Sequence, residues 1–348
     1  MWYEIAIIAA VVTWASIVFG YRLGLVDKPD ARKTHKGEIP LVGGIAIFLT
    51  ILAGIFVLNI PPLTYQMLLI ASIVFAFGVY DDYRHLNAGM RLAVQYGSGA
   101  LLATYGGIAI HNVGNLLGMG DIPLLLLTIP LSALSVAGLS NAFNMIDGID
   151  GLAASTIALP LLVLFLLASS SGHTMASSLL LMLIPVGVFL CFNLGPNTRA
   201  IPKIFLGDGG SVTMGFMVTA CLVYFSQGEN AVILPVTALW LVTVPLMDML
   251  ATMMHRIRNG KKLMEADRSH LHHTLMDLGL SSRQTLALLV SYATVCAIVG
   301  LALQQIPEYL SLLIYFLLFV SHCLFVIKVG RAQRNAAPTM HIEALSTY

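Results

Sequence analysis

Four polar side chains recur at every third position of one short segment between two apolar stretches. The segment Asn141–Ala153 contains Asn141, Asn144, Asp147 and Asp150. On a regular α-helix this spacing rotates each successive side chain by about 60°, so the four groups reach one ligand only where the helix tightens or ends. Amides both donate and accept hydrogen bonds, which suits a planar base, and carboxylates suit a hard metal ion or ribose hydroxyls. The alternative is a polar turn that merely joins two helices.

Two further groups of acids lie at the ends of apolar stretches. Asp81 and Asp82 are adjacent where one stretch ends, and Asp208 lies in the glycine-rich segment Gly207–Ser211 where another begins. Adjacent carboxylates at a helix end can divide a divalent cation and a proton between them. Glycines ahead of a helix leave backbone N–H groups available to an anion. A solvated helix end and a plain connector are the respective alternatives.

Basic and imidazole groups complete the set of candidates. The longest polar segment contains the run Asp267-Arg268-Ser-His270-Leu-His272-His273. Imidazoles beside an arginine can hold or protonate phosphate oxygens, whereas a zinc site would need a further, suitably spaced cysteine or histidine. Lys36, next to a segment rich in glycine and proline, is the N-terminal cation best placed to contact a phosphate. The alternatives are a solvated histidine cluster and, for most cations, a role in membrane topology.

The composition determines which elements position these groups. The chain has 348 residues, of which 58% are hydrophobic and only 10% charged, against about 25% charged in soluble domains. Apolar runs of roughly 20 residues, the length that crosses a bilayer, recur along the chain. We therefore predict an all-α polytopic membrane protein, a single integral domain over 1–348, with about eleven transmembrane helices. The predicted spans are 3–21, 41–59, 64–80, 91–109, 122–139, 152–169, 177–193, 210–226, 231–249, 285–303 and 308–328.

The charges predict the orientation of these spans. All 18 lysines and arginines fall in or beside every second connection, and none falls in the others. By the positive-inside rule the basic connections are cytoplasmic, the N-terminus is periplasmic and the C-terminus is cytoplasmic. Segment 250–284 is then a cytoplasmic loop with the histidine motif, and 329–348 is a cytoplasmic tail. A secondary transporter would instead carry charges at mid-bilayer in two related halves, and the sequence shows no such repeat.

Taken together, these motifs resemble the polyprenyl-phosphate N-acetylhexosamine-1-phosphate transferase family. The resemblance extends from about Asp27 to His273 and includes the segments 27–29 and 39–44. The His-x-His-His form is similar to the WecA-like branch, whereas the MraY-type branch usually has three consecutive histidines. Two departures stand out: His85 replaces a third acid, and Lys262-Leu-Met264 replaces Ser-Pro-Phe. The first leaves a third-carboxylate role open, and the second weakens the assignment of the sugar.

The resemblance implies an enzyme of the bacterial inner membrane with its active site at the cytoplasmic face. It would transfer N-acetylglucosamine 1-phosphate from the UDP-sugar to undecaprenyl phosphate with Mg²⁺ or Mn²⁺, release UMP and start a cell-surface polysaccharide. Another UDP-N-acetylhexosamine, or UDP-MurNAc-pentapeptide, is the alternative donor. Membrane lipids are implied partners, nucleic acid is not, and a homodimer is allowed.

The resemblance also implies roles for individual residues. Asp208 would be the primary metal ligand with Asp81 close to it, and Asp82 would deprotonate or orient the lipid phosphate. Whether transfer takes one step or two is open at this stage. Asn144 and Asp147 would hold the nucleoside, with Asp150 supporting them or contacting the ribose, and Asn141 and Arg268 would also bind substrate. Lys36 and Arg91 would contact phosphates, as would His272 and His273, which together with His270 are the predicted catalytic histidines.

Overall fold

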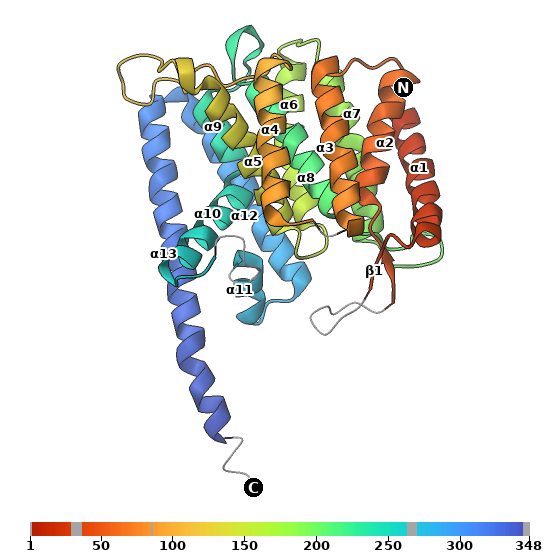
Figure 1. The fold of residues 1–348 in the computed structure, drawn as a ribbon. Coiled ribbons are helices and arrows are strands. Elements are labelled where there is room, and N and C mark those ends of the chain that lie inside the picture. Colours follow the sequence, from red (N-terminus) through yellow and green to blue (C-terminus); the bar gives the residue numbers. More distant parts are fainter. Residues whose placement is uncertain (1, 29–36, 85, 263–269, 344–348) are drawn as a thin grey trace.

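Long helices account for nearly all of the described chain, as expected where no water is present to satisfy backbone N–H and C=O groups. The computed structural model describes residues 2–28, 37–84, 86–262 and 270–343. The helices lie side by side in a bundle, and α13 projects beyond it at one end (Figure 1). The α-helices are α1 Trp2–Leu23, α2 Gly43–Phe56, α3 Tyr65–Arg84, α4 Ala88–Thr104, α5 Thr128–Ile146, α6 Leu152–Ser170, α7 Ala176–Asn193, α8 Asp208–Tyr224, α9 Pro235–Leu241, α10 Thr243–Arg258, α11 Leu271–Asp277, α12 Ser282–Ala302 and α13 Glu308–Glu343. The 3₁₀ turns are η1 Leu125–Leu127, η2 Gly228–Asn230 and η3 Leu303–Gln305, and the strands are β1 Val26–Asp27 and β2 Ile39–Pro40.

Helix α8 is the centre around which the other helices pack. Helices α2, α3, α5 and α6 all contact it, and almost every residue along its length is buried. A helix that is apolar on all sides is one that is enclosed by protein. Its N-terminus approaches α3 closely at Gly209, where an added Cβ would lie 2.7 Å from the carbonyl carbon of Gly78. These two glycines therefore bring the start of α8 against the end of α3, and so the Gly-rich motif against the paired acids.

The eleven predicted spans correspond to eleven helices or helix pairs, but they differ in length. Seven helices of the described chain are long and apolar enough to cross a membrane, or eight if the bent pair α9–α10 is one span. The other three are α2, with 14 residues, and α4 and α8, with 17 each. These seven or eight membrane-length helices show that the chain is a polytopic membrane protein.

The bend between α9 and α10 measures 81°. Val242 between them has a non-helical backbone, and the hydroxyl of Thr243 donates to the Trp240 carbonyl (2.8 Å). Pro245 cannot donate a backbone hydrogen bond, which also favours the start of a new helix at this point. The bend turns α10 out of the line of α9 and toward α13, which it contacts (Figure 1).

Several predicted boundaries are corrected by the structure. The segment after residue 139, expected as a loop, continues as helix α5 to Ile146, so Asn141 and Asn144 lie on its last two turns. The predicted loop 250–284 contains the end of α10 and the short helix α11, and the predicted tail continues α13 as far as Glu343. Hydropathy marks where a helix leaves an apolar medium, whereas its backbone hydrogen bonds continue until the chain turns.

Candidate active site

The paired acids of α3 meet the start of α8 at one end of the bundle. The carboxylate of Asp82 accepts the backbone N–H groups of Asp208 (2.8 Å) and Gly209 (3.1 Å). It therefore supplies from another helix the acceptor that the first turn of α8 lacks within its own chain segment. The Gly-rich motif and the paired acids, 126 residues apart in sequence, are joined by this contact.

Arg91 at the start of α4 connects the remaining acids of this cluster. Its Nη1 lies 3.4 Å from a carboxylate oxygen of Asp81 and 3.4 Å from one of Asp208. The other oxygen of Asp81 accepts the backbone N–H of Leu86 (2.7 Å), and the Asp81 side chain is only 7% exposed. The Asp208 side chain is 54% exposed. Asp208 is thus the acid of this cluster that is most open to an incoming cation or phosphate.

The Asn/Asp segment spans the end of a helix, one of the two arrangements that its spacing allows for a shared ligand. Helix α5 ends at Ile146, and a turn stabilised by the hydrogen bond from Gly148 N–H to the Ile146 carbonyl (2.8 Å) follows. Asn144, on the last turn of α5, donates from Nδ2 to Ser211 Oγ on α8 (3.0 Å). Asp147 follows in the turn, so its side chain no longer has the direction that a continued helix would give it. The contact between Asn144 and Ser211 therefore places the turn 147–151 beside Asp208 at the start of α8.

Asp147 titrates in an unusual environment. The residue is exposed at the surface, yet protein atoms surround the other sides of its carboxyl group, and the structure places further acids nearby. This loss of hydration, followed by the negative charges of Asp208, Asp150 and Asp82, raises the pKa of Asp147 to about 7. A shift of this origin is typical of a site that binds a cation or positively charged group.

Two residues that the sequence reasoning left without a site role hold the turn in place. Asn193, the last residue of α7 and 4% exposed, accepts Gly151 N–H (2.6 Å) and donates to the Ile204 carbonyl (2.8 Å). Lys203 Nζ lies 2.5 Å from Asp150 Oδ2. Asn193 therefore ties the turn 147–151 to the strand-like segment that precedes Asp208, and Lys203 neutralises one of its acids.

The histidine motif divides between two places. His270 Nδ1 lies 2.8 Å from the buried carboxylate of Asp248 on α10, whose second oxygen accepts Leu271 N–H (2.6 Å). His272 lies instead against the turn, because a Cβ added to Gly148 would be 2.1 Å from its Nε2. The His272 and His273 rings are 4.2 Å apart. Gly148 is thus required for the close approach of the histidine motif to the Asp147 turn.

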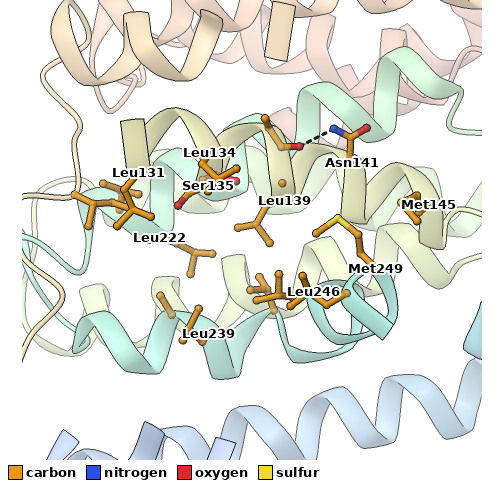
Figure 2. A pocket seen from close by; sticks show the side chains of 18 of the residues that line it. Leu131, Leu134, Ser135, Leu139, Asn141, Met145, Leu222, Leu239, Leu246 and Met249 are labelled. Carbon is orange, nitrogen blue, oxygen red and sulfur yellow. Dashed lines mark hydrogen bonds between the residues drawn. The ribbon is translucent and has the colours of Figure 1, made fainter. Parts of the chain in front are cut away.

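A large apolar cavity leads away from the polar site. Its volume is about 850 Å³, and it runs between α5, α8, α9 and α10, with leucine and methionine side chains along its walls (Figure 2). Asn141 lines it while its amide donates to the Ala137 carbonyl (2.7 Å) and to the Gln95 side chain. The cavity therefore joins the polar cluster at one end. The polar lining residues there are Arg91, Asn141, Asn144, Arg256 and His270.

Most predicted site residues gather at this end of the bundle. Lys36, Arg268 and His85 lie outside the described residues. Within the described ranges, no group of three or more His, Cys, Asp or Glu side chains is arranged to hold a metal by itself.

Asn193, Lys203 and Asp248 were missed as site residues. An acid inside the predicted span 231–249 was the signal for Asp248, because intramembrane carboxylates are costly. Asn193 and Lys203 gave no comparable signal.

Sequence comparisons identify the relatives of this chain. The profile of the family described as Glycosyl transferase family 4 matches residues 64–226, which include the paired acids, the Asn/Asp segment and the Gly-rich motif. An undecaprenyl-phosphate alpha-N-acetylglucosaminyl 1-phosphate transferase of Escherichia coli O157:H7 is 34% identical over 305 residues, covering 86% of this chain and 83% of its own. The proteins of the same description from Yersinia pestis and Haemophilus influenzae are 33% and 32% identical, covering 92% and 90% of this chain and 92% and 88% of their own. Identity at this level over nearly the whole length shows that the chain belongs to the Glycosyl transferase family 4.

Proposed function

We propose that the protein transfers N-acetylglucosamine 1-phosphate from UDP-N-acetylglucosamine to undecaprenyl phosphate and releases UMP. The observation that carries this proposal is the junction of a carboxylate and histidine cluster with an apolar cavity of about 850 Å³. Such a junction suits an acceptor with a phosphate at one end and a long hydrocarbon chain, since the chain is buried while the phosphate stays among polar groups. The relatives described above carry this activity in their names.

The reaction exchanges one phosphoanhydride bond for another. An oxygen of the lipid phosphate attacks the phosphorus that bears the sugar, and the bond from that phosphorus to the bridging oxygen of UMP breaks. Because both partners are anionic, catalysis consists mainly of positioning and charge neutralisation. We assign Asp82 to orient the lipid phosphate and accept its proton, and Arg91 to contact phosphate oxygens beside Asp208.

The turn 147–151 is assigned to the donor substrate. Asn144 and Asp147 offer amide and carboxylate groups to the nucleoside, while Lys203 and Asn193 hold the turn. His272, which lies against this turn, and the neighbouring His273 would contact the diphosphate.

The acids fit Mg²⁺, with Mn²⁺ as a substitute. Magnesium is commonly held by one or two carboxylates together with substrate phosphates, and Asp208 offers the exposed carboxylate of the cluster. Asp81 stands close by and stays a predicted ligand, its oxygens already engaged by Leu86 and Arg91. When bound, the cation would neutralise charge on the transferring phosphoryl group.

We also propose that all eleven helical segments cross the inner membrane, with the site at the cytoplasmic face. A helix of 17 residues spans about 26 Å, close to the roughly 30 Å hydrocarbon core. Helix α8, which is of this length, is enclosed by other helices, so it meets protein in place of lipid along its sides. The distribution of all 18 lysines and arginines supports this orientation.

The test is release of UMP by the purified protein in detergent with undecaprenyl phosphate, Mg²⁺ and a panel of UDP-sugars. We expect turnover with UDP-N-acetylglucosamine, none without a divalent cation, and recovery with Mn²⁺. The Asp208→Asn variant should keep the wild-type unfolding midpoint and lose turnover to below a few per cent. Unchanged turnover in EDTA, or an active Asp208→Asn enzyme, would contradict the metal assignment. Absence of UMP release with every donor would contradict the function.

A further inference from the structure

The polar contacts of Asp248 are unusual for an acid inside an apolar helix. The residue lies on α10 and is 2% exposed, between residues whose side chains line the cavity. Both of its oxygens are used: one by His270 Nδ1 at 2.8 Å and one by the backbone N–H of Leu271 at 2.6 Å. The hydroxyl of Thr252, one turn further along α10, lies 3.4 Å from the same His270 nitrogen. A buried carboxylate is stable only when it is paired in this way.

The contact with Asp248 determines how His270 presents its other nitrogen. An ionised carboxylate only accepts hydrogen bonds, so Nδ1 of His270 carries the proton between them. Nε2 is on the opposite edge of the ring, and it can donate to an anion when it also carries a proton. The same arrangement orients a histidine through its second nitrogen in many metal and catalytic sites.

The position of His270 identifies which substrate it serves. His270 lines the apolar cavity together with Arg256, Met249 and Leu250 of α10. His272, two residues later, lies against Gly148 in the turn assigned to the donor. The two rings are nearly parallel with centroids 5.7 Å apart, so the histidine motif extends from the cavity to the turn.

We propose that Asp248 is a positioning residue that holds His270 toward the cavity, where His270 binds the phosphate of the polyprenyl acceptor and not the UDP-sugar. This inference rests on the proposed function, because it names which substrate one half of the histidine motif recognises. The hydrocarbon chain of the acceptor would lie along the leucine and methionine walls of the cavity shown in Figure 2. Helix α10 thus contributes both a wall for the chain and the support for the group that holds its phosphate.

The test compares Michaelis constants for the two substrates. In Asp248→Asn, an oxygen can still accept Leu271 N–H, but the amide nitrogen would donate to His270 Nδ1, so Nδ1 would have to accept and could no longer donate to this contact. We expect the KM for undecaprenyl phosphate to rise about tenfold, as when a charged hydrogen bond becomes neutral, while the KM for the UDP-sugar stays within about twofold. His270→Gln should show the same selectivity, and the double variant should be no worse than His270→Gln alone.

Two controls separate this role from a structural one. Asp277→Asn makes the same acid-to-amide change at the far end of α11, the short helix whose start Asp248 contacts; Asp277 does not line the cavity, so both KM values should stay unchanged. Asp248→Glu keeps the charge and should retain part of the lipid affinity. A rise in both KM values of Asp248→Asn, or additive effects in the double variant, would overturn the proposal and indicate that Asp248 only docks α11.

A direct binding arm makes the outcome independent of turnover. Binding of a fluorescent short-chain polyprenyl phosphate is measured in detergent, with the corresponding neutral polyprenol as the reference ligand. Wild type should bind the phosphate more tightly, and Asp248→Asn and His270→Gln should each lose about tenfold for the phosphate alone. Equal binding by wild type and both variants overturns the inference. If wild type binds the lipid but never releases UMP, the proposed function fails and the inference is decided by this arm alone.

Discussion

Replacing Asn193 by alanine removes the side chain that ties the donor turn to the segment before Asp208. Asn193 is buried, and its amide accepts Gly151 N–H at 2.6 Å and donates to the Ile204 carbonyl at 2.8 Å. Gly151 and Ile204 are both buried, so alanine would leave two backbone groups unpaired. Each such group costs about 1–3 kcal/mol, which gives a loss of about 2–6 kcal/mol in the free energy of unfolding.

The same change should slow the reaction, because the two hydrogen bonds of Asn193 determine the distance between the turn 147–151 and the acid cluster. A displacement of about 1 Å in a catalytic group can reduce kcat roughly 100-fold, and we expect a fall of about 10- to 100-fold here. Asn193→Asp keeps the acceptor for Gly151 but turns a carboxylate toward the Ile204 carbonyl, so it should also be destabilised. Denaturant unfolding in detergent and UMP release measure the two effects.

Cys191→Ser is the matched control for Asn193, because Cys191 is exposed at the same end of α7. It should change the free energy of unfolding by less than about 0.5 kcal/mol and leave kcat unchanged. An Asn193→Ala protein with the stability and the kcat of wild type would refute the reasoning, since the turn would then keep its position without the hydrogen bonds of Asn193.

Three further predictions follow from the geometry of the site. Asn144→Ala should weaken UDP-sugar and UMP binding by about 1–3 kcal/mol in calorimetric titration, whereas Asp82→Asn should bind the UDP-sugar nearly normally and fail in turnover; the reverse pattern would invert the assignment of the two clusters. Asp147→Asn should stabilise the cation-free protein by an amount that grows between about pH 4 and pH 7 and then stays constant. The pKa of Asp147 is raised to about 7 in the folded protein, so the free energy of unfolding of wild type falls as pH rises through this window. Solvent access reduces the size of this gain, and thermal unfolding across pH would contradict it if the gain instead shrank as pH rises. In a Cys191→Ser background, a cysteine at Glu229 should react with a membrane-impermeant maleimide in intact spheroplasts and one at Arg199 should not, while the opposite labelling would reverse the orientation.

The membrane class and the family were determined by the sequence itself, because the properties that define them are local. A helix in hydrocarbon needs an uninterrupted apolar run, and the chain contains many such runs with few charges between them. The three-residue spacing of the Asn/Asp segment likewise predicted a helix that tightens or ends within it, and α5 ends at Ile146. The resemblance of the acid and histidine motifs to the family likewise predicted a single site before any fold was known.

The contacts within that site were decided only by the tertiary structure. Asp82 caps α8 across 126 residues, and Asn193 joins the ends of two loops that are 53 residues apart. Asp248 binds His270, which lines the cavity, whereas His272 of the same motif lies against the turn 147–151. Such pairings depend on how helices pack, through close approaches such as Gly78 to Gly209 and the 81° bend before α10. Helix packing is set by side-chain shape across many residues at once, and no local pattern in the chain records which buried amide or acid will meet which partner.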